Sequence, residues 1–228
     1  MARHASSLEQ RLAAIIAPAL GDGGPFYEVL RPPSQATVKE TKKDGYAEVA
    51  CTIPEGHICI QWRFEETGRF LFLRGDKNAD GALLFIGPDD RIEAHIIECK
   101  RKVTQGKWED ILQQMRWTLY KLLALAGVLG LSIDEVRLGT AYRFDELSEE
   151  SSPNPTLGKP TLGGTSERTP GEDQLSESRL RQLAWENDEV YLPGFDGVFR
   201  HIKIQLDEDS GRGVHQTPAP RSRFARQL

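Results

Sequence analysis

An acid and a base lie two positions apart in the segment IECKRK, residues 97–102. Because side chains alternate across a β-strand, Glu98 and Lys100 should share one face, while Cys99 points to the other. We expect Cys99 to pack as a small hydrophobe beneath the helix that carries Trp108. Its backbone carbonyl is then the group of this residue that is available for chemistry.

A second acid, Asp80, comes just before the apolar run ALLFIG. The turn sequence GPDD should pair strands over 82–86 and 92–96, which brings Asp80 and Glu98 to the same edge of a sheet. Two carboxylates, an amine and a carbonyl suit a hard divalent cation that activates water against a phosphodiester, with the lysine orienting that water or stabilising charge on phosphorus. Asp76 is the alternative acid, although an aspartate there more often shapes the turn.

The elements that must position these groups can be read from hydrophobic periodicity. A first helix is expected from Ser6 to about residue 20, and a long amphipathic helix from Lys107 to about Gly130. The expected strands are YAEVACTI, HICIQWRFE, RFLFLRG, ALLFIG, RIEAHIIECK and EVRLGTAYRF. A strand, a crossover helix and a further strand form a βαβ-like unit, so the pattern predicts an α/β or α+β fold.

The second half of the chain divides by composition. Residues 6–147 form the expected core, and 148–174, rich in Ser, Thr, Pro and Gly, should be a linker or loop. Residues 175–206 should form a helix and a β-hairpin that rejoin the sheet. The basic tail, 207–228, is expected to be disordered.

Composition places the chain among ordinary globular proteins, with 39% hydrophobic and 28% charged residues. No stretch approaches the ~20 apolar residues that span a bilayer, and the N-terminus lacks the apolar core of a secretory signal. Three cysteines without paired spacing argue against a disulfide framework or a zinc knuckle. We therefore expect a cytoplasmic protein that does not enter membranes.

A net charge of −5 does not favour a general polyanion-binding surface, so nucleic-acid binding would depend on local patches. Arg101, Lys102 and Lys107 form such a patch beside Lys100. The alternative is a solvated basic face, but beside two carboxylates these cations suit a phosphate backbone. The histidines show no ligand spacing, and no P-loop or serine-histidine pair is present.

The order NADGALLF, HIIECK, helix and strand resembles the PD-(D/E)XK nuclease superfamily. The resemblance implies a restriction-endonuclease-like core, in which a mixed β-sheet is flanked by helices in the order αβββαβ. It implies that Asp80, Glu98 and the Cys99 carbonyl bind Mg²⁺ or Mn²⁺ and that Lys100 assists the chemistry. Ala79 replaces the proline that usually precedes the first acid.

The resemblance also leaves Glu9, on the first helix, open as a further metal ligand. It points to Gln113 as a catalytic residue, with the neighbouring Gln114 as the alternative. Trp117 stands where one branch of the superfamily has tyrosine.

The implied function is metal-dependent hydrolysis of DNA, in bacterial defence against foreign DNA or in DNA processing. A helicase or ATPase subunit of a defence complex is the implied partner, and a homo-oligomer is left open. The alternative is a noncatalytic subunit that keeps the fold to bind nucleic acid or a protein partner.

Overall fold

The protein has a mixed α/β fold, seen in a computed structural model that describes residues 10, 27–40, 46–64, 77–149 and 183–217. A mixed sheet of seven strands runs in the order β1-β4-β5-β6-β7-β9-β8. These strands are β1 (Tyr27–Leu30), β4 (Ile58–Trp62), β5 (Gly81–Ile86), β6 (Ile92–Val103), β7 (Glu135–Asp145), β8 (Glu189–Val190) and β9 (Phe199–Gln205). The pairs β6–β7 and β7–β9 are parallel, and the other neighbours are antiparallel.

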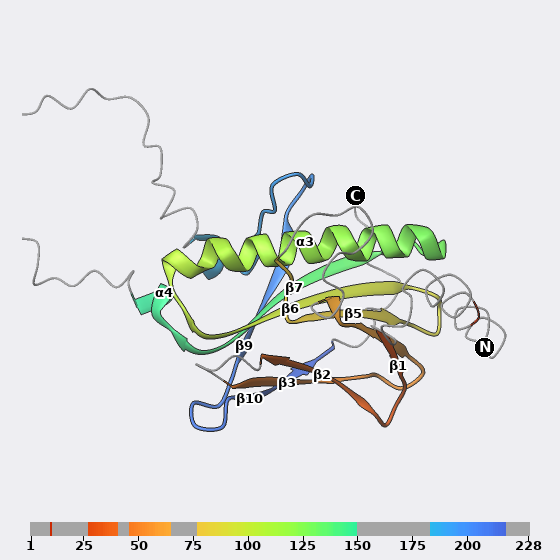
Figure 1. Cartoon of the computed structure of the whole chain (residues 1–228), viewed down its shortest axis with the longest axis horizontal. Helices are drawn as coiled ribbons and strands as arrows, with labels where there is room; N and C mark the ends of the chain where they lie inside the picture. The colour runs from red at the N-terminus through yellow and green to blue at the C-terminus, as the bar shows by residue number, and fades with distance from the viewer. Residues whose placement is uncertain (1–9, 11–26, 41–45, 65–76, 150–182, 218–228) are drawn as a thin grey trace, which may run out of the picture.

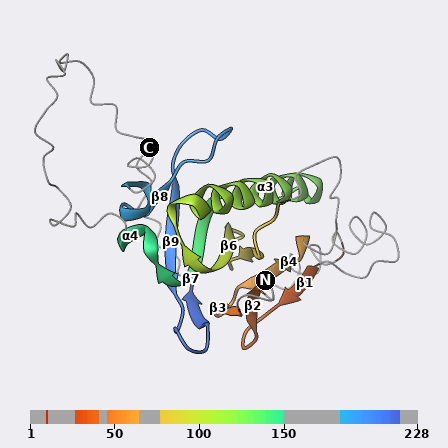
Figure 2. The same ribbon diagram turned by 60° about the vertical axis from the view of Figure 1, so that its left-hand side comes forward.

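Three layers make up the described part of the chain (Figure 1). Helix α3 (Gln105–Leu129) covers one face of the large sheet, and a sheet in the order β10-β3-β2 covers the other. The small sheet consists of β2 (Gln35–Glu40), β3 (Ala47–Thr52) and β10 (Arg212–Gln216). The turned view in Figure 2 shows the same separation of α3 from the small sheet, and the one-turn helix α4 (Glu146–Glu149) follows β7.

Helix α3 forms where the periodicity predicts it, with both ends capped. The Thr104 side chain accepts from Lys107 N–H, and Gly130 ends the helix with a left-handed φ of 65°. Its apolar stripe packs on the sheet through Trp108, Ile111, Met115, Leu119, Leu122 and Leu125, all buried. Between β6 and β7 it makes the predicted crossover. No helix in the described part of the chain is long and apolar enough to cross a membrane.

Cys99 lies on the opposite side of the sheet from the one we expected. Strand alternation separates it from Glu98 as predicted, but α3 covers the face of Glu98 and not that of Cys99. Cys99 instead packs with Ile97 and Val38, beneath the small sheet. The prediction failed because alternation defines two faces without saying which layer covers each.

The strands at the two ends of the described chain also differ from expectation. β1 and β2 occupy a stretch that gave no strand signal, and β3 pairs with β2 and β10 rather than joining the large sheet. β10 lies within the tail that was expected to be disordered, and this expectation was wrong for Arg212–Gln216. A buried histidine, His215, anchors β10, so the segment lacks the apolar alternation that marks a strand.

Several predicted segments lie outside the described residues. They are the first helix except for Gln10, the strand over 69–75, the linker from 150 to 174, and the chain from 218 to 228. Residues 183–186 are helical, within the helix expected before β8. β8 and β9 then add to the large sheet beside β7.

Gly81 opens β5 at the point where the small sheet packs most closely on the large one. A Cβ at this position would lie 2.7 Å from Val38 Cγ1 and closer still to Cγ2. We predict that Gly81→Ala destabilises the protein by ~1–3 kcal/mol through overpacking. Urea denaturation should show part of this loss restored in the Gly81→Ala, Val38→Ala double variant.

Gly106 provides the matched control for this substitution. It lies in the first turn of α3, and nothing is within 4 Å of an added Cβ. Gly106→Ala should therefore leave stability unchanged or raise it, by up to ~1 kcal/mol. Equal stability of Gly81→Ala and the wild type would contradict the tight packing of β2 on β5.

Candidate active site at the start of β5

The hairpin of β5 and β6 brings Asp80 and Glu98 together. Gly81 pairs with Ile97, so the preceding Asp80 lies opposite Glu98 at the edge of the hairpin. Asp80 N–H donates to Glu98 Oε2 at 3.2 Å, and Cys99 N–H donates to Asp80 Oδ2 at 2.7 Å. One bond therefore joins Asp80 to Glu98 directly, and the other joins Asp80 to the backbone of the next residue.

Lys100 shares the face of Glu98 and donates from Nζ to Glu98 Oε1. The Glu98 side chain is completely buried, whereas 14% of the Lys100 side chain is exposed. The carboxylate therefore lies inside the protein, and the amine lies at its boundary with solvent. A buried acid of this kind requires a partner, because an unpaired buried charge is strongly unfavourable.

Burial is the main cause of the raised pKa values of Asp80 and Glu98. It raises the pKa of Asp80 to about 8, with a further contribution from the negative charge of Glu98. Burial likewise raises the pKa of Glu98 to about 7, although Lys100 opposes this shift by charge and hydrogen bond. Burial would lower the pKa of Lys100, but Glu98 and Asp80 keep it above the ordinary value. Near neutral pH Asp80 is therefore mostly protonated, whereas Glu98 is close to the midpoint of its titration.

The backbone of Cys99 faces the same edge as the two acids. In an extended strand, the N–H and C=O of one residue point to the same neighbour. Since Cys99 N–H points to Asp80, its carbonyl is directed to that side as well. Burial raises the pKa of the Cys99 thiol well above its usual value, so this cysteine is not a thiolate nucleophile.

A third acid, Glu40 at the end of β2, influences the site from the small sheet. It follows Val38 by two positions and so shares the face of β2 that packs over Gly81. Its negative charge raises the pKa of both Asp80 and Glu98. Glu40 was not predicted as a site residue, because it belongs to a strand that periodicity does not reveal.

We predict that Glu40→Gln lowers the pKa of both site acids, because it removes a nearby like charge. Removal of the charge should also weaken divalent-cation binding by about twofold, as expected for a charge that acts at a distance. Carbon-detected NMR titration of the carboxyl groups would measure the first effect, and Mn²⁺ titration the second. Glu48→Gln on the neighbouring β3 is the control, and equal shifts in both variants would rule out a specific role for Glu40.

The other residues predicted from the resemblance are placed differently. Gln113 is exposed on α3 and accepts from Lys77 Nζ at 3.3 Å, whereas Gln114 donates to Asn78 O at 3.1 Å, two residues before Asp80. The structure thus brings Gln114, the alternative residue, closer to the acid-bearing turn. Glu9 lies outside the described residues.

The predicted basic patch is exposed at the end of β6 and the start of α3. Lys102 pairs with Glu146 of α4, while Arg101 and Lys107 are exposed and form no ion pair within the described residues. Arg101 is next to Lys100 in β6, and by strand alternation its side chain points to the other face. The exposed Arg101 and Lys107 are available to a polyanion, and Lys102 is partly neutralised.

Two buried polar residues of α3 were missed. Thr118 and Lys121 contact the turn before Asp80 and are 0% and 2% exposed. A sequence signal for them did exist. Thr118 lies three positions and Lys121 six positions after Met115, within the apolar stripe of α3. Polar residues at core-facing positions of a helix require partners.

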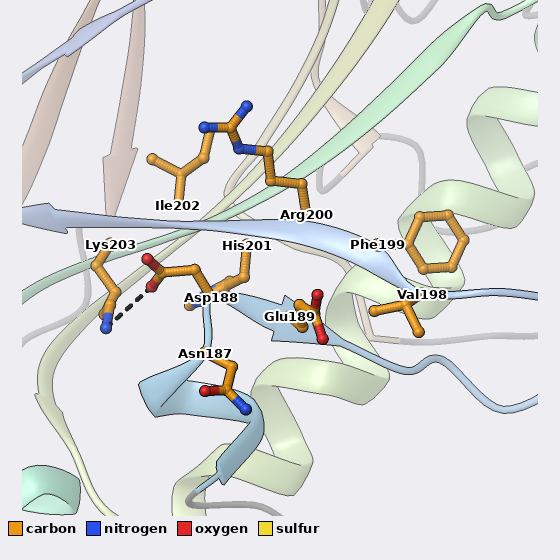
Figure 3. A pocket seen from close by; sticks show the side chains of 9 residues that line it. All are labelled: Asn187, Asp188, Glu189, Val198, Phe199, Arg200, His201, Ile202 and Lys203. Carbon is orange, nitrogen blue, oxygen red and sulfur yellow. Dashed lines mark ion pairs between the residues drawn. The ribbon is translucent and has the colours of Figure 1, made fainter. Parts of the chain in front are cut away.

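A separate hollow lies beside β9, near the β8 edge of the large sheet (Figure 3). Asp188 and Lys203 form an ion pair of 2.9 Å there, and His201 contributes to the lining. The charged groups of the pair neutralise each other. None of the predicted site residues contributes to this lining.

The groups at this site that could hold a metal are the carboxylates of Asp80 and Glu98 and the Cys99 carbonyl. Two carboxylates and a carbonyl supply oxygen ligands, the type that Mg²⁺ and Mn²⁺ prefer. Burial and mutual repulsion disfavour two ionised acids here, and a bound cation would relieve both effects. No group of three His, Cys, Asp or Glu side chains suitable for a metal occurs among the described residues, so this set consists of two carboxylates and backbone.

Comparisons with protein-family models, curated proteins and solved structures gave no match for this chain.

Proposed function

We propose that this protein is a Mg²⁺- or Mn²⁺-dependent deoxyribonuclease with a restriction-endonuclease-like core. The observation that carries the proposal is the pairing of Asp80 with Glu98 and Cys99, with Lys100 on the same face as Glu98. The order of three antiparallel strands, β4, β5 and β6, then α3 and the parallel β7, agrees with the arrangement implied by the resemblance.

Each residue has a distinct part in this proposal. Asp80, Glu98 and the Cys99 carbonyl would hold the cation, which when bound supplies Lewis-acid stabilisation of the phosphate and a more acidic water. Lys100, at the boundary with solvent, would donate a hydrogen bond to that water or to a phosphate oxygen. Its elevated pKa keeps it protonated, so it acts as a donor and not as a base.

Substrate binding would involve Arg101 and Lys107, the exposed cations of the predicted basic patch. Contacts of this kind bind the phosphate backbone without reading sequence. By the same resemblance, the proposal includes a cytoplasmic role in defence against foreign DNA or in DNA processing, alongside a helicase or ATPase.

Incubation of the purified protein with plasmid and linear DNA would test the proposal, with Mg²⁺, with Mn²⁺ and with excess chelator. Cleavage only in the presence of metal is expected, with weaker DNA binding as salt rises. Arg101→Met should weaken DNA binding, whereas Lys39→Met on the small sheet is the control, because Lys39 pairs with Glu48. DNA binding without metal binding or cleavage would favour the noncatalytic subunit instead.

A further inference from the structure

The turn that carries Asp80 is fixed to α3 by polar contacts. Ala79 N–H donates to Thr118 Oγ1 at 2.8 Å. Lys121 Nζ donates to Asn78 Oδ1. With the bond from Gln114 to Asn78 O, three helical side chains hold two consecutive residues of the turn.

The three helical residues form one line along α3. Gln114, Thr118 and Lys121 follow the spacing i, i+4, i+7, which places them on one side of a helix. Apolar side chains would fill this position without any need for partners. Burial of a hydroxyl and an ammonium is tolerated only where hydrogen bonds compensate, and the turn supplies them.

The position of Asp80 depends on this attachment. Ala79 is its immediate neighbour, and Asp80 contacts Glu98 through its N–H and Cys99 through its carboxylate. A displacement of Ala79 would therefore move both contacts. Shifts of about 1 Å in a reacting group can reduce rates by ~10²-fold.

We infer that Thr118 and Lys121 are positioning residues, which fix the Asn78–Asp80 turn so that Asp80 meets Glu98 and Cys99. Their importance for metal binding rests on the proposed function. Their effect on the geometry of the turn is independent of the proposed function, and it can be measured without metal.

Thr118→Val is the sharpest test, because it keeps the shape of the side chain and removes the acceptor for Ala79 N–H. We expect the amide resonance of Cys99 to shift, since its acceptor Asp80 moves, and the Mn²⁺ affinity to fall by about tenfold. Thr118→Ser, which keeps the hydroxyl, should restore both values. If Thr118→Val does not fold, the half-buried Gln114→Ala gives the same readouts.

Leu125→Ala is the matched control on the same helix. Leu125 is fully buried, and its truncation should lower the thermal midpoint through a cavity while leaving the Cys99 amide and the Mn²⁺ affinity unchanged. An equal loss of Mn²⁺ affinity in Leu125→Ala would show that general destabilisation, and not positioning, is responsible.

Two different failures can be told apart. If wild type binds Mn²⁺ and Thr118→Val binds it equally, with an unshifted Cys99 amide, the positioning role is wrong and the proposed function stands. If wild type binds no Mn²⁺ and cleaves no DNA, the proposed function is wrong. The Cys99 amide in Thr118→Val then still decides whether α3 positions the turn.

Discussion

Asp80→Asn should abolish metal-dependent cleavage and yet make the metal-free protein more stable at pH 8. The loss of activity, by at least ~10²-fold, follows from removing a charged ligand of the proposed cation. The gain in stability follows from the raised pKa of Asp80, because burial makes an ionised carboxylate unfavourable at this position. Asparagine can still accept from Cys99 N–H, but it carries no buried charge.

The size of this gain in stability depends on pH. The pKa of Asp80 rises from an ordinary 3.8 to about 8 on folding. Between these values the folded state retains a proton that the unfolded state has released, so wild-type stability declines as pH rises through this window. Asp80→Asn lacks this decline, and its advantage at pH 8 should be on the order of a few kcal/mol.

Thermal unfolding in chelator at pH 5 and pH 8 would measure this effect. The midpoint of Asp80→Asn relative to wild type should rise between the two pH values. Asp110→Asn on α3 is the control, because Asp110 is exposed and Lys77 lowers its pKa, so its variant should show no such rise. A constant difference between Asp80→Asn and wild type would mean that Asp80 is ionised in the free protein.

Lys100→Met should slow cleavage by ~10²–10³-fold, and its effect on metal binding should depend on pH. The substitution keeps the alkyl chain and removes the charge that lowers the pKa of Glu98. Below about pH 7, Glu98 then holds its proton more firmly, and the cation binds more weakly. As pH rises, Glu98 ionises more readily in the variant as well, and the loss of a nearby positive charge then favours the cation. The weakening should therefore be smaller at pH 9 than at pH 6.

Mn²⁺ titration of Lys100→Met and wild type at pH 6 and pH 9 would measure this pH dependence. Glu98→Gln should differ, with weak binding at both values, because the ligand itself is lost. Lys102→Met is the control, since Lys102 lies two positions further along β6 and pairs with Glu146. Equal weakening of binding in Lys100→Met at pH 6 and pH 9, as expected for Glu98→Gln, would contradict the separation of roles between the amine and the acid.

The sequence was most informative where structure is local. The hairpin that joins Asp80 to Glu98 depends on a short turn between two apolar runs, and α3 depends on periodicity within one segment. Both features were predictable because neighbouring residues decide them.

Features that depend on distant parts of the chain were not predictable. The layer that covers Cys99 is built from strands remote in sequence, and Glu40 reaches the site only because β2 packs over Gly81. Thr118 and Lys121 interrupt an apolar pattern, and their partners become visible only when the turn is placed against α3.

The pairing of β10 with β3 has a consequence for the order in which the protein folds. Thr217 Oγ1 donates to Thr52 O at 2.7 Å, although the two residues are 165 positions apart. Contacts of such long range form slowly, whereas the β5–β6 hairpin and α3 need only nearby chain. During synthesis on the ribosome, Asp80 and Glu98 can therefore meet well before the small sheet is complete. At that stage the small sheet, which packs over Gly81, still lacks β10, and this layer beside the candidate site is completed only when β10 pairs with β3.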